Sequence, residues 1–448
     1  MFKVLPAAAA LPLHGSAGSR RVERRVLARR PDLIEDAGLA VAKLALALHR
    51  GGGVWVACGP GNNGADGRVA ARHLAAQGLA VSTDDAPPPD TGLVVDALFG
   101  LGLARPLEDA WAARVAQINA LAGRATVLAV DLPSGLDAER GVAHGSAVRA
   151  DHTLALLTLK PGLLTGAGRA CAGTLWFDAL GEAPADALDG APTATLIGRD
   201  RLAPWRTRDP LAHKGTQGDV QVVAGSMPGA ARLAARAALA AGAGRVYAEV
   251  DDALRPELLR WDGRALATVV AGCGGGARIV WRLPALLDAA PRLVLDADAL
   301  NAIARDPALA AALRARAAPT LLTPHPLEAA RLLETDAAAV QADRLGAARA
   351  LAARYACTVV LKGSGSVVAA PGRVPAVNGS GGPALATPGS GDVLAGWAGG
   401  LWAQRPGLDA FDVACAAVHW HGLAGDTQAH GPLRANELIE RMLGLDPR

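Results

Sequence analysis

The fold class of the first half of the chain is indicated most clearly by residues 54–75, Val54-Trp-Val-Ala-Cys-Gly-Pro-Gly-Asn-Asn-Gly-Ala-Asp-Gly-Arg-Val-Ala-Ala-Arg-His-Leu-Ala75. A short apolar run leads into a glycine-rich turn, which is followed by alanine-rich sequence with helical spacing. Glycines let backbone N–H groups approach a phosphate closely, and the N-terminus of the following helix adds partial positive charge. A glycine-rich turn alone is also typical of a simple tight connection. The Asn62-Asn63 pair and Asp66 favour a ligand, because amides and a carboxylate are costly to bring together without one.

Short apolar runs alternate with alanine-rich helical stretches on both sides of this turn. Runs of this length are typical of strands buried on both faces, which predicts parallel sheets with helices on either side. In the first half we expect a helix over residues 18–50 and strands over 54–57, 93–95, 127–130 and 154–157. In the second half we expect strands over 220–224, 245–250, 293–295, 320–322, 358–361 and 367–369, and helices over 229–242, 393–404 and 411–426.

The best candidate for a domain boundary is the segment 183–210. It contains four prolines and few periodic apolar positions, and strand-helix alternation restarts after it. A chain of 448 residues has room for two or three domains. We therefore expect two α/β domains in series, residues 1–205 and residues 206–448.

Composition restricts the class of protein. Hydrophobic residues make up 51% and charged residues 19%, which excludes a disordered chain. The net charge of +3 is small for this length, so we expect neither nucleic-acid nor membrane partners. Five scattered cysteines without a CxxC pair predict neither disulfides nor zinc, and favour the cytoplasm. The apolar stretch at residues 1–13 contains two prolines and precedes an Arg-rich helix, so we do not expect a secretory signal.

Polar residues follow two further strands of the first domain. Asp96 comes directly after one apolar run, and Asp131 and Ser134 come after another. Each aspartate alone would also suit a turn or a helix N-cap. Because ligands bind at the carboxyl ends of the strands in an open parallel sheet, we expect Asn63, Asp96 and Asp131 to converge there. Oxygen ligands with few carboxylates suit potassium better than zinc.

The second domain has a comparable glycine-rich turn before its first C-terminal helix. Gly389, Ser390 and Gly391 would form an anion-binding nest at the start of this helix, with Asp392 beside it as a base. An ordinary N-cap with an aspartate in the first turn is the alternative. Three further polar strings follow predicted strands and are candidates for the same site: Asp296-Ala-Asp-Ala-Leu-Asn301, Thr323-Pro-His-Pro-Leu-Glu328 and Lys362-Gly-Ser-Gly-Ser366.

Four strings in the first half resemble the NAD(P)H-hydrate epimerase domain over about residues 10–210. They are GPGNNGADG at 59–67, VDALFG at 95–100, DLPSGLD at 131–137, and ADHT with KPG at 150–162. The resemblance implies a Rossmann-like three-layer fold, catalysis by Asp131 and a potassium ion held by Asn63, Asp96 and Ser134. It implies that the hydrated cofactor is bound by Asn62, Asn63, Gly64, Ala65, Asp66, Gly100, Leu101, Gly102, Leu103, Ala104, Arg105, Pro106 and Asp131.

Ala65 is one departure from that family, which has glycine at this position. A methyl group there would oppose the backbone if the position required positive φ, and would be harmless at negative φ. We expect negative φ, because Asn62, Asn63, Gly64 and Asp66 are all retained around it.

The second half resembles the ADP- or ATP-dependent NAD(P)H-hydrate dehydratases, which have a ribokinase-like fold, over about residues 200–445. The HKG, DADALN, TPHP and LKGSGS strings occur in the order typical of that family. The resemblance implies that Ala230, Gly274, His325 and Asp392 contact the hydrated cofactor, although GCGGG at 272–276 stands where the family usually has GPGLG. It also implies nucleotide contacts from Lys362, Gly363, Ser364, Gly365, Ser366 and Gly391.

These resemblances predict a bifunctional repair enzyme for hydrated NADH and NADPH. Its first domain would interconvert the R and S hydrates, and its second would dehydrate the S form with Asp392 as base. We expect potassium and magnesium ions, ADP rather than ATP as co-substrate, and a homo-oligomer. The alternative is a small-alcohol phosphotransferase of the ribokinase-like class fused to a non-catalytic binding domain.

Overall fold

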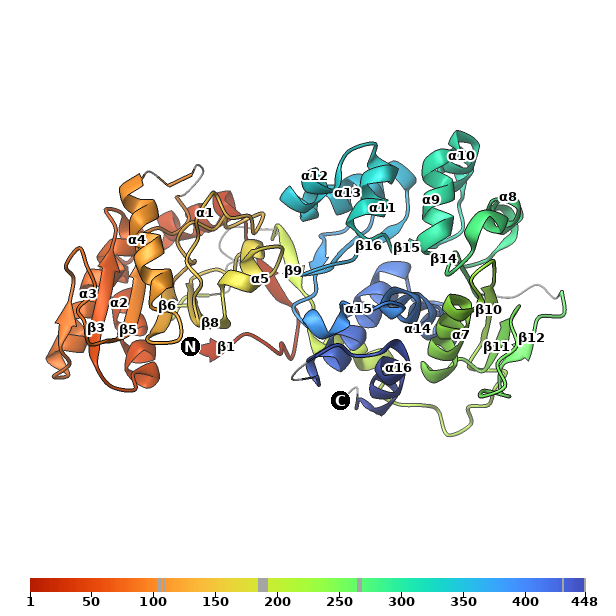
Figure 1. Ribbon diagram of the computed structural model, residues 1–448, viewed down its shortest axis with the longest axis horizontal. Helices are drawn as coiled ribbons and strands as arrows, with labels where there is room; N and C mark the ends of the chain where they lie inside the picture. The colour runs from red at the N-terminus through yellow and green to blue at the C-terminus, as the bar shows by residue number, and fades with distance from the viewer. Residues whose placement is uncertain (103–105, 108, 184–191, 264–267, 429–430, 447–448) are drawn as a thin grey trace. The chain divides into compact units, whose positions relative to one another are not determined.

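The protein is described by a computed structural model covering all residues except 103–105, 108, 184–191, 264–267, 429–430 and 447–448 (Figure 1). It divides into two compact units. The first comprises Met1–Pro6 and Leu11–Thr195, and the second comprises Ala7–Ala10 and Leu196–Arg448. The division after Thr195 falls within the proline-containing segment 183–210.

The first unit is built on a sheet with strand order β1-β8-β7-β6-β5-β3-β4. All neighbouring pairs are parallel except β1 with β8. Its elements are β1 (Phe2–Lys3), β2 (Leu11–Leu13), α1 (Ser16–Leu27), α2 (Leu33–Leu48), β3 (Gly53–Cys58), α3 (Asn62–Ala76), β4 (Val81–Ser82), β5 (Thr91–Ala97), α4 (Asp109–Ala120), β6 (Thr126–Val130), β7 (His152–Leu156), η1 (Pro161–Leu163), α5 (Gly168–Cys171) and β8 (Thr174–Asp178).

Helices cover both faces of this sheet, as continuous apolar strands require. Along β3, Val54 and Val56 pack in a core that includes residues of α1, α2 and α3. Trp55 and Ala57 point to the opposite face and pack with Val115 of α4. The strand order reverses between β3 and β5. The chain passes from β3 to β4 at one edge of the sheet and then returns to β5 on the other side of β3, from which β6, β7 and β8 follow in order. This reversal is the switch point at which open α/β sheets bind ligands.

The prediction of one helix over residues 18–50 is wrong. The structure has two helices, α1 and α2, separated by a short turn. The break occurs at Arg30-Pro31. Proline disfavours the helical conformation of the residue before it and lacks an N–H group, so one helix cannot pass through this point easily. The apolar periodicity continues on both sides and concealed the break.

The second unit contains a sheet in which parallel strands run in the order β12-β11-β10-β13-β14-β15-β16, followed by antiparallel β17 and β18. The order reverses between β10 and β13, which makes a second switch point. Strand β9 (Ala194–Leu196) lies at the boundary of the units. The strands that follow are β10 (Asp219–Val223), β11 (Arg245–Ala248), β12 (Leu259–Arg260), β13 (Thr268–Ala271), β14 (Leu293–Leu295), β15 (Thr320–Leu322), β16 (Thr358–Leu361), β17 (Val367–Ala369) and β18 (Ala376–Val377).

Helices cover both faces of this sheet as well (Figure 1). They are η2 (Arg199–Trp205), α7 (Pro228–Ala240), η3 (Gly276–Arg278), α8 (Ile279–Ala289), α9 (Ala297–Arg305), α10 (Pro307–Ala315), α11 (Pro326–Leu333), α12 (Ala337–Ala342), α13 (Arg344–Tyr355), η4 (Pro383–Leu385), α14 (Ser390–Gln404), α15 (Ala410–Asp426) and α16 (Ala435–Gly444). The strand and helix pattern confirms the α/β fold class.

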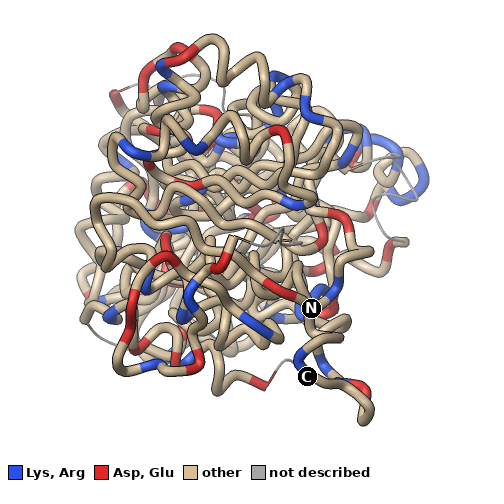
Figure 2. Tube along the Cα trace, turned by 90° about the vertical axis from the view of Figure 1, so that its right-hand side faces the viewer, with Lys and Arg blue, Asp and Glu red and all other residues tan. Residues whose placement is uncertain are grey.

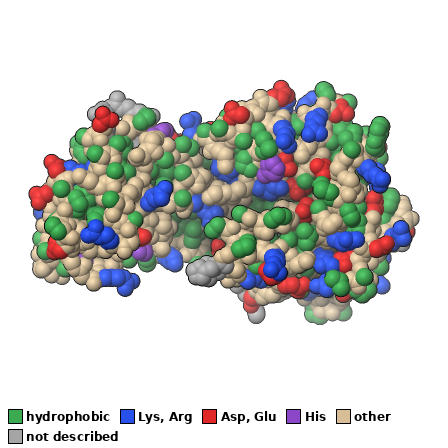
Figure 3. Space-filling model, in the orientation of Figure 1, with side chains coloured by type: hydrophobic (Ala, Val, Ile, Leu, Met, Phe, Trp, Pro, Cys, Tyr) green, Lys and Arg blue, Asp and Glu red, His purple; other side chains and the backbone are tan. Residues whose placement is uncertain are grey.

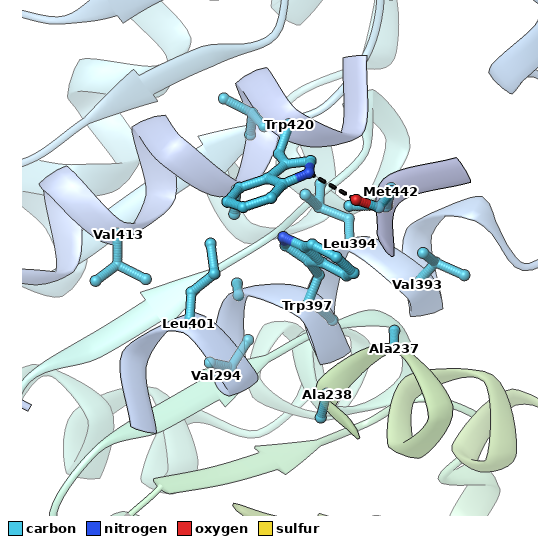
Figure 4. Packing of buried hydrophobic residues seen from close by; sticks show 14 of the residues in the cluster. Ala237, Ala238, Val294, Val393, Leu394, Trp397, Leu401, Val413, Trp420 and Met442 are labelled. Atoms are coloured by element: carbon cyan, nitrogen blue, oxygen red, sulfur yellow. Dashed lines mark hydrogen bonds between the residues drawn. The ribbon is translucent and has the colours of Figure 1, made fainter. Parts of the chain in front are cut away.

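Helix α14 contributes many residues to the hydrophobic core of this unit. A side chain at Gly396 would meet the Ala234 carbonyl of α7 at 2.0 Å, so the two helices approach too closely for any residue but glycine. Trp397 of α14 packs edge-on against Trp420 of α15, with ring centroids 5.3 Å apart (Figure 4). This packing fixes the start of α14, where Asp392 lies.

Charges of both signs are interspersed along the chain (Figure 2), and on the face in Figure 3 they lie among hydrophobic side chains. Within the described residues, no helix combines the length and the apolar character needed to cross a membrane.

Candidate active sites

The first unit has a cavity of about 660 Å³ at its switch point. Residues that follow β3, β5 and β6 line it, together with residues of α1 and α2 and the segment after β7. The predicted site residues among its lining are Asn62, Asn63, Asp66, Gly100, Leu101, Gly102 and Asp131. The convergence of Asn63 and Asp131 at the carboxyl ends of the strands therefore exists in the structure.

Glycines after β3 allow the chain to fold tightly against its neighbours. A side chain at Gly59 would meet the Leu98 carbonyl at 1.8 Å, and one at Gly64 would meet the Gly59 carbonyl at 1.9 Å. The first turn of α3 is thereby pressed onto the turn before it. Asn63, in this turn, is buried, and its Nδ2 has no hydrogen-bond partner within the described chain. A buried amide without a partner is costly, which favours a ligand at this position.

Ala65 lies within the first turn of α3, and its N–H donates to the Gly61 carbonyl at 3.1 Å. It is not among the described non-glycine residues with positive φ. The methyl group is therefore compatible with the backbone, as expected. Gly64 and Ala65 do not line the cavity, and neither does Pro106. Leu103, Ala104 and Arg105 lie outside the described residues.

Asp131 is held in an unusual conformation beside a buried lysine. Its φ is +65°, a left-handed backbone that is uncommon for a residue other than glycine. Its Oδ1 accepts a hydrogen bond from the Leu156 N–H at 3.1 Å and forms an ion pair with Lys160, which is 1% exposed. Burial, followed by the negative charges of Asp131 and Glu23, raises the pKa of Asp66 to about 8. The cavity thus combines an ion-paired carboxylate with a carboxyl group that retains its proton near neutral pH.

Asp96 and Ser134 form a second polar group behind the cavity. Asp96 is fully buried and accepts hydrogen bonds from the Ser134 N–H at 2.8 Å and the Ser134 hydroxyl at 2.6 Å. Burial raises the pKa of Asp96 to about 6, although both bonds from Ser134 oppose this shift. The Phe99 N–H donates to Ser134 Oγ at 2.9 Å, and an atom added at Gly100 would lie 3.6 Å from Asn63 Oδ1. A buried carboxylate with only neutral donors, next to hydroxyl and amide oxygens, suits a weakly charged cation.

The second unit brings polar side chains from successive strand ends to one place. Asp296 follows β14 and is 2% exposed. Its Oδ1 accepts hydrogen bonds from Lys362 Nζ at 2.6 Å and from Thr323 Oγ1 at 2.8 Å. Lys362 follows β16 and Thr323 follows β15, so neighbouring strands contribute the three groups. Burial lowers the pKa of Lys362, but the charges of Asp296 and Glu328 outweigh it and raise the pKa overall.

Asp392 lies beside this cluster, in the first turn of α14. Its carboxylate, the Asp296 carboxylate and the Cys273 thiol have ligand atoms within 4.8 Å of one another. Burial and then the charge of Asp296 raise the pKa of Asp392 to about 6. An atom added at Gly391 would lie 3.2 Å from Lys362 Nζ, which joins the glycine nest to the cluster. Gly389, the N-cap, has φ of +89° and needs its glycine.

Ala230 and Gly274 lie together at the switch point between β10 and β13. A side chain at Gly274, whose φ is +66°, would meet Ala230 Cβ at 3.0 Å and the Met227 carbonyl at 2.3 Å. His325 is the N-cap of α11, where its Nδ1 accepts from the Leu327 and Glu328 N–H groups at 3.1 and 3.2 Å. Burial, followed by the charge of Lys362, lowers the pKa of His325, so its ring is neutral. The two hydrogen bonds that cap α11 therefore occupy Nδ1 of the His325 ring.

For three residues of the two sites, the sequence did not predict the contact that the residue makes. Lys160 and Asp296 are parts of quoted strings, KPG and DADALN, but nothing local shows that they pair with Asp131 and Lys362. Cys273 stands where the resembled family usually has proline. That departure drew attention to the loop but did not predict that Cys273 contacts Asp296. In the structure, Cys273 Sγ lies 3.9 Å from Asp296 Oδ2.

Two doubly wound α/β units, each with a polar site at the switch point of its sheet, define a two-domain α/β enzyme. Residues 30–88 and 81–162 match the family described as YjeF-related protein N-terminus, and residues 220–442 match NAD(P)H-hydrate dehydratase. The bifunctional NAD(P)H-hydrate repair enzyme of Leishmania braziliensis is 35% identical over 92% of this chain and 88% of its own. That of Escherichia coli is 35% identical over 89% and 85%. The chain belongs to the family of bifunctional NAD(P)H-hydrate repair enzymes.

Among solved structures, the ADP/ATP-dependent NAD(P)H-hydrate dehydratase of Bacillus subtilis, co-crystallised with ATP and Mg²⁺, is 28% identical. The similarity covers 55% of this chain and 95% of the Bacillus chain, with a TM-score of 0.49.

Proposed function

We propose that this chain repairs hydrated NADH and NADPH in two steps, one in each unit. The first unit interconverts the R and S hydrates, and the second restores the cofactor from the S hydrate with a nucleotide as phosphoryl donor. The observation that carries this proposal is the presence of two separate polar sites, one around Asp131 and one around Asp392, in a chain of the repair family.

In the first unit, the cavity is large enough for the nicotinamide half of the substrate. The substrate phosphates would lie at the N-terminus of α3, where N–H groups and the helix dipole favour negative charge. The neutral Asp66 carboxyl group would give its proton to the substrate hydroxyl, which leaves as water while the ring nitrogen donates its electron pair and the C–O bond breaks. Asp131 would take a proton from the water that then adds to the opposite face of the ring carbon, and this proton returns to Asp66, so the carbon is inverted with no net change in protons. The ion pair with Lys160 holds the Asp131 carboxylate in a fixed orientation for this role.

Asn63, Asp96 and Ser134 would hold a potassium ion next to this cavity. The ion would supply positive charge toward the substrate phosphates and would compensate the buried Asp96 carboxylate. The neutral partners of the buried Asp96 carboxylate support this assignment. The Asn63 Nδ2, which has no partner among the described residues, is a donor and would face an acceptor on the substrate.

In the second unit, the problem is that hydroxide is a poor leaving group. Asp392 would remove the proton of the substrate hydroxyl, whose oxygen then attacks the terminal phosphoryl group of the nucleotide. The C–O bond breaks as the ring nitrogen donates its electron pair, phosphate departs, and loss of a ring proton restores the dihydropyridine. Magnesium, when bound, would neutralise the charge of the nucleotide phosphates.

The nucleotide would bind at the loop of residues 362–366 and at Gly391. Lys362 lies between this loop and the Asp296 cluster, where it reaches the transferred phosphoryl group as a point charge. We propose ADP as the donor, which yields AMP and phosphate.

The test is to incubate the purified protein with mixed R and S hydrates, with and without ADP and Mg²⁺, and to follow the absorbance of the reduced nicotinamide. We expect complete recovery with ADP and none without it. A phosphorylated hydrate that accumulates without release of phosphate would contradict dehydration and would indicate a simple phosphotransferase.

We further propose a cytoplasmic homo-oligomer in which residues 1–205 and 206–448 are the functional domains. The five cysteines are free thiols, which suits a reducing compartment. Light scattering after size-exclusion chromatography tests the oligomer, because a monomer mass of 45.3 kDa would contradict it.

A further inference from the structure

Arg344, the first residue of α13, lies beneath the loop of residues 362–366. It is 1% exposed. Its Nη2 donates to the carbonyls of Leu361 at 3.2 Å, Lys362 at 3.0 Å and Gly365 at 3.3 Å. Its Nη1 donates to Gln341 Oε1 at 2.5 Å. One buried side chain therefore binds the backbone of this loop at three points.

The charge of Arg344 is not compensated locally. No carboxylate of the described residues lies within 4 Å of its guanidinium, and its Nε is buried without a hydrogen-bond partner there. Burial lowers the pKa of Arg344 to about 10, so the side chain remains protonated at neutral pH. A buried cation without a counter-charge is costly, unless an anion binds nearby.

The hydrogen bonds from Arg344 also set the direction of the loop peptides. In a trans peptide the N–H points away from the C=O. Because the Lys362 and Gly365 carbonyls point at the guanidinium, the N–H groups of Gly363 and Ser366 point away from it. Gly363, at φ of +131°, allows this arrangement, and a side chain there would lie 3.0 Å from Arg344 Nη1. Two outward N–H groups of one loop over a buried cation are a suitable receptor for phosphate oxygens.

We propose that Arg344 is a positioning residue for the nucleotide site: it turns the N–H groups of the 362–366 loop toward the phosphates and adds an unpaired positive charge behind them. This inference rests on the proposed function, in which this loop binds ADP. Arg344 reaches no substrate atom itself, since it is buried under the loop.

The test compares Arg344→Met, which removes the charge and the fork, with Arg344→Lys, which retains the charge alone. Arg349→Met, at an exposed position of the same helix, is the matched control. Affinity for ADP is measured by calorimetry with Mg²⁺, and KM for ADP, KM for the S hydrate and kcat are measured separately. We expect Arg344→Met to weaken ADP binding and raise KM for ADP at least tenfold, with KM for the hydrate within twofold. Arg344→Lys should recover part of the affinity, and Arg349→Met should match the original protein.

A folded Arg344→Met variant that binds ADP within twofold of the original protein would overturn the inference. If that variant does not fold, Arg344→Lys decides, and unchanged ADP affinity there counts equally against it. Ser364→Asp distinguishes the two levels of the proposal, because it places a negative charge in the exposed loop. Weaker ADP binding in Ser364→Asp but not in the Arg344 variants would leave the nucleotide site standing and remove the role of Arg344. Unchanged binding in Ser364→Asp would contradict the nucleotide site itself.

Discussion

Asp392 is the residue on which the dehydration chemistry depends. It lies beside Cys273 and Asp296 at the start of α14, and its carboxylate is the proposed base. We expect Asp392→Asn to lower the nucleotide-dependent dehydration rate by about 10²–10⁴-fold, since the amide has nearly the same shape but cannot accept the proton. Epimerisation should remain nearly unchanged, which serves as the control for folding. A variant that retains more than half of the dehydration rate would refute the assignment.

The pH dependence of dehydration follows from the same carboxyl group. Burial and the charge of Asp296 raise its pKa to about 6, and only the ionised form can act as a base. We therefore expect kcat/KM for the S hydrate to be constant above about pH 7, to halve near pH 6 and to fall about tenfold per unit below that. The pH profile in saturating ADP and Mg²⁺ measures this. A rate that rises as the pH falls below 6 would require an acid in place of the base.

The sequence identifies candidate site residues but not their partners. Asp131 and Asp392 were predictable because each directly follows an apolar strand or a glycine nest. Their surroundings were not: Lys160 pairs with Asp131 across 29 residues, and Lys362 pairs with Asp296 across 66. Such pairs depend on which strands become neighbours, and a local pattern contains no information about that order.

Ala65, which stands in α3 where the family has glycine, can be tested by substitution. Ala65 has a helical backbone, so glycine at this position relieves no strain. We expect Ala65→Gly to leave the epimerisation rate on the R hydrate within twofold. The first unit should lose about 0.5–1 kcal/mol of unfolding free energy, because glycine is a poor helix former. A tenfold faster Ala65→Gly variant would show that the methyl group impairs the natural enzyme.

The proposed potassium site lies at the ends of β5 and β6, and its occupancy can be measured through the stability of the first unit. A ligand that binds only the folded protein at five times its Kd adds about 1 kcal/mol of stability, which corresponds to about 2–4 °C for a unit of this size. We expect K⁺ to raise the unfolding temperature of the first unit by this amount over an equal concentration of choline. In Asp96→Asn the difference should vanish. Equal unfolding temperatures of the unaltered protein in both salts would remove the potassium assignment.

Elements were more predictable than contacts. Ten strands were expected, and each lies within a few residues of its predicted range, because buried strands are short apolar runs that stand out in the sequence. The other strands, among them β8 and the central β13, were not predicted. The two helices within residues 18–50 were merged, since their apolar spacing continues across Pro31. The antiparallel strands β1, β17 and β18 also departed from the expected parallel sheets, because strand direction depends on connections rather than on local composition.

In the whole molecule, the proposed function places one reaction in each unit. The compact units have separate cores, and every site residue discussed lies wholly within one of them. Asp131→Ala should therefore abolish epimerisation and leave dehydration of pure S hydrate intact, while Asp392→Asn does the reverse. Neither variant alone should convert the R hydrate to the reduced cofactor faster than spontaneous epimerisation permits.

The most direct test mixes these two variants in equal amounts with the R hydrate, ADP and Mg²⁺, and follows the absorbance of the reduced nicotinamide. If the reactions are separate, the S hydrate released by Asp392→Asn is consumed by Asp131→Ala. The rate of conversion then returns to within about twofold of that of the unaltered protein at a concentration that supplies the same number of intact sites of each kind. If a folded Asp131→Ala or Asp392→Asn variant has lost both partial reactions, so that the mixture stays at the spontaneous rate, the assignment of one reaction to each unit is contradicted.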